Sequence, residues 1–309
     1  MAGTVDVLVA FSYSLMNGLL ILDKPAGFTS HDVVALVRRA TGERSIGHLG
    51  TLDPMATGVL PLLLGRYTRL AQFFGTAEKR YTGTIRFGWA TDTYDAEGVA
   101  KGPAKPLTLG LEELRDLAKR FRGEMDQLPP IYSAKKIKGV PAHVLARAGA
   151  EVPVKTAKVT IHEFSIAGLD VERGEASFAI SISAGGYVRS VAHEMGEMAG
   201  CGAHLSQLRR TQAGPFGLED AISVEELKQR AESPEALAAL LPHPRTMLTE
   251  MPCVTVDERV AGQIRNGMQV NLPEFGSAPL VKVFTTPTDL LAVVRRVAGT
   301  LMQPTLVLG

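Results

Sequence analysis

The sequence predicts an α+β fold, in which strands and helices mix along the chain without a regular βαβ rhythm. Three patterns carry this prediction. The apolar run 18–22 indicates a buried strand, the strict alternation over 80–87 a half-buried strand, and the apolar spacing over 111–121 an amphipathic helix. With 309 residues, 45% of them hydrophobic, the chain can form about two domains with a sizeable core. No fixed period suggests repeats.

The first elements are expected to be a strand, a helix and a glycine-rich loop. The strand 18–22 stops at a turn that contains Pro25 and Gly27. Ser30 is expected to cap a helix that ends at Gly42. The loop 47–58 follows, and the apolar run after it reads as a second buried strand.

The middle of the chain is expected to continue with further strands and helices. Strands are predicted at 159–164 and 176–183, and a helix at 187–199. Ser223 and Glu226 have the spacing of a capping box. The side chains expected to face inward from the helix 187–199 are Val188, Val191, Ala192, Met195 and Met198.

We expect a short disordered N-terminus, a large central domain and a small β-rich tail. Residues 1–16 are mildly apolar and lack a basic region typical of a signal peptide, and Met16 is an alternative start. Pro242 and Pro244 mark a boundary between a domain at 17–249 and a tail at 250–309. The tail reads as short strands, with turns at Asn266-Gly267 and around Pro287.

The total charge excludes a globally basic protein, because 33 Lys and Arg face 32 Asp and Glu. The charge is nevertheless uneven: residues 131–160 carry six basic residues and one acidic residue, whereas 218–250 carry three and seven. A basic stretch of this kind fits a polyanionic ligand, although charge runs are usually only solvated faces. Two cysteines and no run of about 20 apolar residues favour a reducing, cytoplasmic setting without a membrane span.

Asp53 is the most suggestive candidate for chemistry. Pro54 biases it away from helical geometry, and the surrounding glycines permit tight backbone paths that could project the carboxylate into a cleft. The alternative is an aspartate that merely forms a turn. His48 has no His or Cys neighbours at the spacing of metal ligands, so no metal site is expected. His48-Leu49 stands where the phosphate-binding P-loop motif has Lys followed by Ser or Thr, so binding of a nucleotide triphosphate is not expected either.

Arg189 follows a Gly-Gly turn at the start of a predicted helix. It could be a solvated arginine, or it could pair with a buried carboxylate and lower its pKa. Tyr81 falls on the apolar face of its strand, where most tyrosines are core residues.

The segment Gly47–Leu60, GHLGTLDPMATGVL, resembles the catalytic motif of the TruB family of tRNA pseudouridine-55 synthases. Further segments agree with the family in the same order, so the resemblance covers about residues 17–217 well and the tail weakly. These segments are Leu22–Pro25, Lys79–Tyr81, Thr91–Asp95, Phe121–Gly123, Tyr132–Ala134, Gly186–Ser190, Gly200–His204 and Leu208–Arg210.

The resemblance implies a pseudouridine-synthase fold, with a mixed, largely antiparallel sheet flanked by helices and a PUA-like, β-rich C-terminal domain that binds RNA. It implies an isomerase that converts uridine 55 in the T-loop of tRNA, with no cofactor. It implies tRNA as the binding partner, with no membrane association and no obligatory protein partner. It also implies that the chain is a monomer. A non-catalytic tRNA-folding chaperone, a guide-dependent synthase of the box H/ACA type and a glycosidase are the alternatives.

The resemblance also implies roles for particular residues. Asp53 matches the nucleophile, Arg189 the arginine that pairs with it, and Tyr81 the tyrosine that stacks on the target base. His48 matches the histidine that enters the RNA stack when the target flips out. The remaining candidate substrate-binding residues are Tyr187, Leu208, Lys24 and Arg69. The family often has lysine at the position of Arg69 and an aromatic residue at that of His143.

Overall fold

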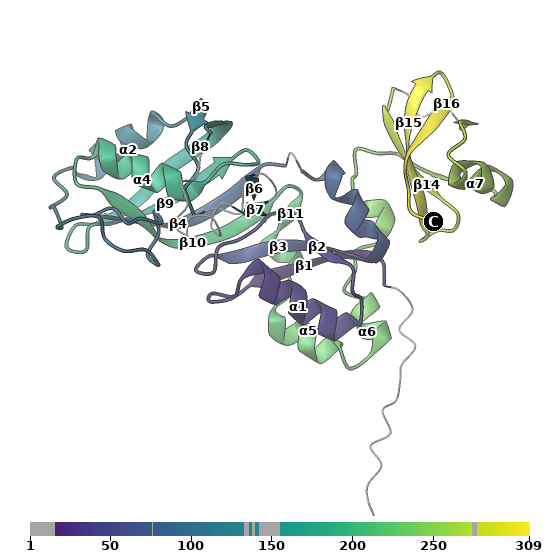
Figure 1. Ribbon diagram of the computed structural model, residues 1–309, viewed down its shortest axis with the longest axis horizontal. Coiled ribbons are helices and arrows are strands. Elements are labelled where there is room, and N and C mark those ends of the chain that lie inside the picture. The colour runs from purple at the N-terminus through teal and green to yellow at the C-terminus, as the bar shows by residue number, and fades with distance from the viewer. Residues whose placement is uncertain (1–15, 76, 133–135, 138–139, 142–154, 274–276) are drawn as a thin grey trace, which may run out of the picture.

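The structure, a computed structural model, describes residues 16–75, 77–132, 136–137, 140–141, 155–273 and 277–309 (Figure 1). The expectation for residues 1–16 therefore falls almost wholly outside the described residues. The same holds for most of the basic stretch at 131–160, His143 included.

The main element is a nine-stranded mixed sheet, which confirms the predicted fold class. Seven strands follow the order β1-β3-β10-β4-β9-β8-β5, with β2 paired to β3 and β11 to β10. The pair β3–β10 is parallel and the other pairs are antiparallel. The strands are β1 Gly18–Lys24, β2 Ile46–His48, β3 Thr57–Leu64, β4 Lys79–Phe87, β5 Gly123–Gln127, β8 Ala157–Asp170, β9 Glu175–Ile182, β10 Ala203–Ala213 and β11 Phe216–Gly217.

Helices flank this sheet in two groups (Figure 1). In one group, α2 packs on β8 and α4 on β10; in the other, α1 and α5 lie against β2 and β1. The helices are α1 Ser30–Thr41, α2 Leu111–Lys119, α4 Val188–Met198, α5 Val224–Arg230 and α6 Pro234–Ala238. The 3₁₀ turns are η1 Gly65–Phe73, η2 Leu218–Asp220 and η3 Pro244–Thr246, and a separate two-stranded pair joins β6 Lys136–Ile137 to β7 Val140–Pro141.

The cap predicted for α1 is wrong by one residue. Thr29 is the cap, because its hydroxyl accepts from the backbone N–H of Asp32 at 3.0 Å while the Asp32 carboxylate accepts from the Thr29 N–H at 2.8 Å. Ser30 is the first helical residue, and it is buried. The predicted end at Gly42 is confirmed by its left-handed φ of 68°.

The helix α4 follows its prediction except at its last turn. Val188, Val191, Ala192 and Met195 are buried, whereas Met198 is 48% exposed, so its inward placement was wrong. Ser223 caps α5 by accepting from the N–H of Glu226 at 3.0 Å, as its spacing predicted.

The C-terminal unit is a five-stranded sheet in the order β12-β14-β15-β16-β13, and it confirms the β-rich tail. Its turn around Pro287 joins β14 to β15, as predicted. The predicted turn at Asn266-Gly267 is present too, but it follows an unpredicted helix that Asn266 caps, and Gly267 has φ 73°. The elements are β12 Cys253–Thr255, α7 Glu258–Arg265, β13 Val270–Asn271, β14 Leu280–Phe284, β15 Leu290–Ala298 and β16 Leu301–Val307.

An apolar cluster connects this C-terminal sheet to the main sheet. Leu19 and Leu63 from β1 and β3 share the cluster with Phe284, Val293 and Leu306 from the C-terminal strands. The remaining apolar core lies partly under the main sheet and partly within the C-terminal unit. The division at residues 249 and 250 stays a prediction, and the shared cluster implies that the two parts do not move freely.

Candidate active site

Asp53 lies on the loop between β2 and β3, and neighbouring groups fix this loop. The hydroxyl of Ser30 donates to the Leu52 carbonyl at 3.1 Å and accepts from the Leu52 N–H at 2.9 Å. On the other side of Asp53, the ammonium of Lys24 donates to the Pro54 carbonyl at 3.2 Å. Both neighbours of Asp53 are thus held by buried side chains, so its carboxylate is presented from a rigid loop.

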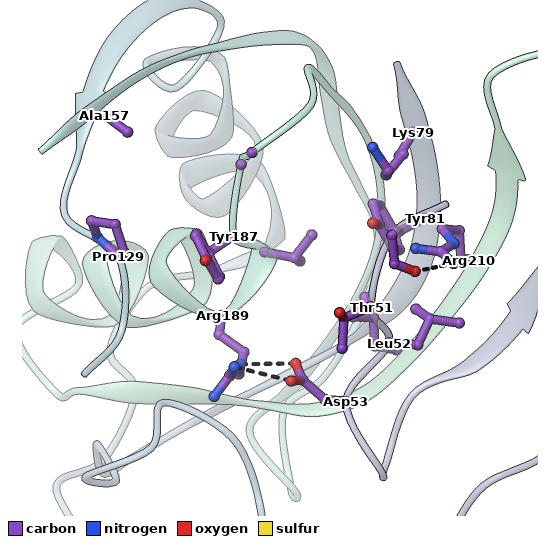
Figure 2. A pocket seen from close by; sticks show the side chains of 15 residues that line it. Thr51, Leu52, Asp53, Lys79, Tyr81, Pro129, Ala157, Tyr187, Arg189 and Arg210 are labelled. Carbon is purple, nitrogen blue, oxygen red and sulfur yellow. Dashed lines mark hydrogen bonds and ion pairs between the residues drawn. The ribbon is translucent and has the colours of Figure 1, made fainter. Parts of the chain in front are cut away.

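Arg189 binds the carboxylate of Asp53 with two nitrogens. Its Nη2 donates to Oδ1 at 3.0 Å, and its Nε lies 3.0 Å from Oδ2 (Figure 2). Arg189 is in the first turn of α4 and is buried, whereas Asp53 comes from 136 residues earlier in the chain. The fold therefore brings together the carboxylate and the guanidinium that the sequence singled out.

Asp95 is a second carboxylate on the same arginine, and the sequence reasoning missed it. Its Oδ2 lies 3.2 Å from Arg189 Nη1, and its Oδ1 accepts from the Thr93 hydroxyl at 2.6 Å and the Glu97 N–H at 3.1 Å. The side chain is almost fully buried. Asp95 belongs to the segment Thr91–Asp95, which resembles the TruB family, but nothing in the linear sequence links it to Arg189, 94 positions away.

The pKa of the Asp53 carboxyl is raised above its ordinary value of 3.8, and burial is the largest cause. The positive charge of Arg189 lowers this pKa, while the negative charge of Asp95 raises it. The direction is therefore opposite to that expected from pairing with arginine alone, because desolvation outweighs the ion pair. The Asp53 side chain is still 32% exposed, so water reaches it until a ligand fills the cavity.

A cavity of about 530 Å³ opens above the Asp53–Arg189 pair. Figure 2 shows Tyr187 on one side of it, opposite Tyr81, with Asp53 and Arg189 at one end. Tyr81 and Leu208, both buried, come from the neighbouring strands β4 and β10. The whole lining is Gly50, Thr51, Leu52, Asp53, Lys79, Tyr81, Pro129, Ala157, Gly185, Gly186, Tyr187, Val188, Arg189, Leu208 and Arg210.

Gln127 fixes the position of Tyr187 and was also missed. This fully buried amide accepts from the Tyr187 N–H at 2.7 Å and donates to the Tyr187 carbonyl at 3.1 Å. Because Tyr187 precedes α4, these bonds also set where that helix begins, and with it the position of Arg189.

His48 lines a second cavity, of about 760 Å³, which also borders the Asp53–Arg189 pair. Asp53 and Arg189 line both cavities, while His48 shares the second one with His31 and Glu97. The Nδ1 atom of His48 is buried without a hydrogen-bond partner in the part of the chain that the structure describes. Burial, followed by the charge of Arg210, lowers the pKa of His48, so its imidazole is neutral near pH 7.

Lys24 lines neither of these two cavities, and its expected contact with substrate stays a prediction; its described contacts are those of a residue that positions the loop. Its side chain is fully buried, and its ammonium donates to the carbonyls of Phe28, Pro54 and Pro25. Burial is the main reason that its pKa falls to about 8. A cation enclosed in this way holds the Asp53 loop against the end of β1.

Changing Lys24 to methionine is therefore expected to lower stability rather than RNA affinity. Three half-buried carbonyls lose their donor, at a cost of about 2–3 kcal/mol in the free energy of unfolding. Urea denaturation measures this cost, and RNA binding by the folded variant should change only a few fold. If the variant kept its stability but lost most of its affinity for RNA, Lys24 would instead contact the RNA directly.

Arg69 also lines neither cavity. It is exposed on η1, and its Nη1 donates to the carbonyl of Val307 in β16 at 2.5 Å. The neighbouring Arg66 donates to the Leu308 carbonyl at 3.0 Å. The structure thus places Arg69 at the junction with the C-terminal sheet, away from the other candidates.

The described residues hold no group of three or more His, Cys, Asp or Glu side chains that could bind a metal ion. Over the same residues, no helix combines the length and the apolar character that crossing a membrane requires.

Two family models match the chain. The one described as "TruB family pseudouridylate synthase (N terminal domain)" matches residues 38–188, and "tRNA pseudouridylate synthase B C-terminal domain" matches residues 189–247. The first range contains Asp53 and Tyr81, and the second begins at Arg189.

Curated relatives are similar over most of their length. A protein of Solibacter usitatus named "tRNA pseudouridine synthase B" is 43% identical over 296 residues, 95% of this chain and all of the relative. A protein of the same name from Geobacter sulfurreducens is 41% identical, with 82% of each chain covered. The counterpart from Aquifex aeolicus is 39% identical over 87% of this chain and 92% of its own.

Solved structures share the fold. The chain superposes on one from a "Cbf5-Nop10-Gar1 Complex" with a TM-score of 0.68 and 25% identity, over 94% of this chain and 85% of the other. A chain of the "archaeal box H/ACA sRNP Nop10-Cbf5 complex" gives 0.67 and 23%, over 96% and 87%. Both likenesses extend over the main sheet and the C-terminal unit.

Proposed function

The chain belongs to the TruB family of pseudouridylate synthases, and on this premise we propose that it isomerises uridine 55 in the T-loop of tRNA. The N1–C1′ bond breaks, the uracil rotates, and a C5–C1′ bond forms; C5 loses its proton and N1 takes one up, so that the product is an isomer of the substrate. The relatives named "tRNA pseudouridine synthase B" support tRNA as the substrate. The observation that carries the proposal is the Asp53–Arg189 pair at one end of a cavity with two tyrosines.

Asp53 acts as the nucleophile in this proposal. A carboxylate can add to the sugar or the base, or stabilise a cationic sugar, and then leave again. Arg189 holds the Asp53 carboxylate in one orientation and places a positive charge beside it. Asp95 does not serve as a general acid of the glycosidase type, because it is buried and bound by Arg189, Thr93 and the Glu97 N–H.

The base of the flipped uridine lies between Tyr81 and Tyr187 in this proposal, against Leu208. Tyr81 stacks on the uracil and helps to remove the C5 proton. The glycosidic bond is inaccessible in a stacked loop, so the nucleotide must flip out. The neutral imidazole of His48, which lines the second cavity, enters the stack that the uridine leaves.

We also propose that the purified chain works alone, as a monomer without cofactor or protein partner, and that the C-terminal sheet adds RNA contacts. It should convert one uridine of an unmodified tRNA transcript, and mapping the product should place it at position 55. Binding without any conversion would favour a tRNA-folding chaperone. Conversion that required a second RNA or protein would favour a guide-dependent synthase.

The activity should fall at acidic pH as Asp53 becomes protonated, because only the carboxylate is a nucleophile. Burial raises the pKa of Asp53, so the loss should be centred above pH 3.8. Asp95→Asn removes a negative charge that raises this pKa, and the acidic limb should therefore move to lower pH. Plots of kcat/KM against pH for the two proteins measure the shift. A shift to higher pH in the variant would contradict this electrostatic coupling.

A further inference from the structure

Arg210 is a buried cation in the wall of the cavity whose guanidinium is not fully bonded. Its side chain is fully buried, and it donates from Nε to the Val59 carbonyl at 2.7 Å and from Nη2 to the Gly50 carbonyl at 3.1 Å. Its Nη1 has no hydrogen-bond partner among the described residues. Over those residues, no carboxylate lies within ion-pair distance of Arg210.

Lys79 is a second cation beside Arg210. It lines the same cavity from β4, and its ammonium donates to the Ala77 carbonyl at 3.3 Å. Burial and the charge of Arg210 lower the pKa of Lys79. A Cβ placed on Gly50 would lie 3.2 Å from Lys79 Cε and 3.6 Å from Arg210 Nη1, so both side chains border one small space that this glycine leaves open.

Two adjacent cations without a carboxylate are unfavourable in a buried wall. The other arginines near the site contrast with them, because Arg189 binds Asp53 and Asp95, and Arg209 binds Asp23. An anion from outside the chain would compensate the charge of Lys79 and Arg210. Guanidinium and ammonium donors together match the oxygens of a phosphate.

We propose that Lys79 Nζ and Arg210 Nη1 bind a phosphodiester group of the RNA next to the flipped uridine. This inference rests on the proposed function, because it assumes that an RNA substrate enters the cavity and that its backbone lies along the side formed by Lys79 and Arg210. Figure 2 shows Lys79 and Arg210 on the side of Tyr81, with the Asp53–Arg189 pair at the other end. The phosphate is thus held at one end of the cavity and the sugar is presented to Asp53 at the other. The contact positions the nucleotide and reads no base.

Binding of a T-arm stem-loop tests this proposal, with Asp53→Asn in every protein so that no turnover occurs. The two phosphates that flank the target uridine are replaced, one at a time, by neutral methylphosphonates. One replacement should weaken binding about tenfold when Lys79 is present, as expected for one charge-assisted contact. In Lys79→Met the same replacement should weaken binding only about threefold, because the Arg210 contact is all that is left to lose. The matched control Lys119→Met, an exposed lysine on α2, should keep the tenfold effect.

Salt provides a second readout. The dependence of log K on log salt should become less steep by about one in Lys79→Met, because one phosphate contact is lost. Lys79 is used because Arg210 also holds the Gly50 and Val59 carbonyls, and its removal endangers the fold. If the methylphosphonate weakens binding equally with and without Lys79, the phosphate-binding inference is wrong. It is also wrong if the methylphosphonate has no effect on Kd at either of the two linkages. Neither result would bear on the proposed function. Failure of the chain with Asp53 intact to bind the stem-loop would overturn the proposed function as well.

Discussion

Replacing Asp53 with asparagine is expected to abolish pseudouridine formation, by at least about 10⁴-fold, while tRNA affinity changes only a few fold. The amide has nearly the shape of the carboxylate but cannot add to carbon and leave again. Arg189 keeps Asp95 and the carbonyls of Thr93 and Tyr132 as partners, so the wall of the cavity should persist. Loss of the C5 hydrogen from labelled uridine measures turnover, and filter binding measures affinity.

The control for this variant is Asp116→Asn, which removes an exposed carboxylate on α2 that pairs only with the exposed Lys119 among the described ion pairs. It should retain the activity of the unmodified chain. Conversion that survives in Asp53→Asn would contradict the nucleophile assignment even if the chain is a synthase. If Asp53→Asn lost both turnover and binding, the result would indicate a damaged loop, and urea denaturation would show it.

The helices and strands could be predicted where one face of an element is buried. The alternation over 80–87 became β4, and the apolar spacing over 187–199 became α4. Predictions failed where two neighbouring residues could both serve, as with Ser30, whose hydroxyl is used by Leu52 while Thr29 caps the helix. The turn predicted at Asn266-Gly267 is present, but the same dipeptide also ends helices, and the helix Glu258–Arg265 before it was not predicted.

The candidate site was predictable only as far as local motifs reach. Asp53 and Arg189 could be proposed from their segments, and the structure places them in contact. Lys24 belonged to an equally familiar segment, but only three-dimensional burial shows that its ammonium is enclosed by carbonyls. Asp95, Gln127 and Arg210 act through partners that are distant in sequence, and no spacing rule reveals such contacts.

Arg189→Lys is expected to lower kcat about 100-fold or more and to destabilise the fold by about 3 kcal/mol. The guanidinium joins Asp53 and Asp95 with separate nitrogens, and a single ammonium cannot occupy all of these positions. A buried carboxylate that loses its partner costs about 3–5 kcal/mol, and the retained charge of lysine offsets part of that. Single-turnover kinetics and urea denaturation measure the two effects.

Arg209→Lys is the matched control, because Arg209 also binds one carboxylate, Asp23, with two nitrogens but is 40% exposed and lines neither cavity. Arg209→Lys should lower the free energy of unfolding by at most about 1 kcal/mol and leave kcat unchanged.

Adding Asp95→Asn to Arg189→Lys separates the roles of the two carboxylates. With one buried charge fewer to neutralise, the double variant should be more stable than the sum of the single effects predicts. Turnover should not recover to the same degree, because lysine still cannot orient both oxygens of Asp53. Additive stability effects would mean that Arg189 serves Asp53 and Asp95 independently, and a full recovery of kcat would mean that its charge alone matters.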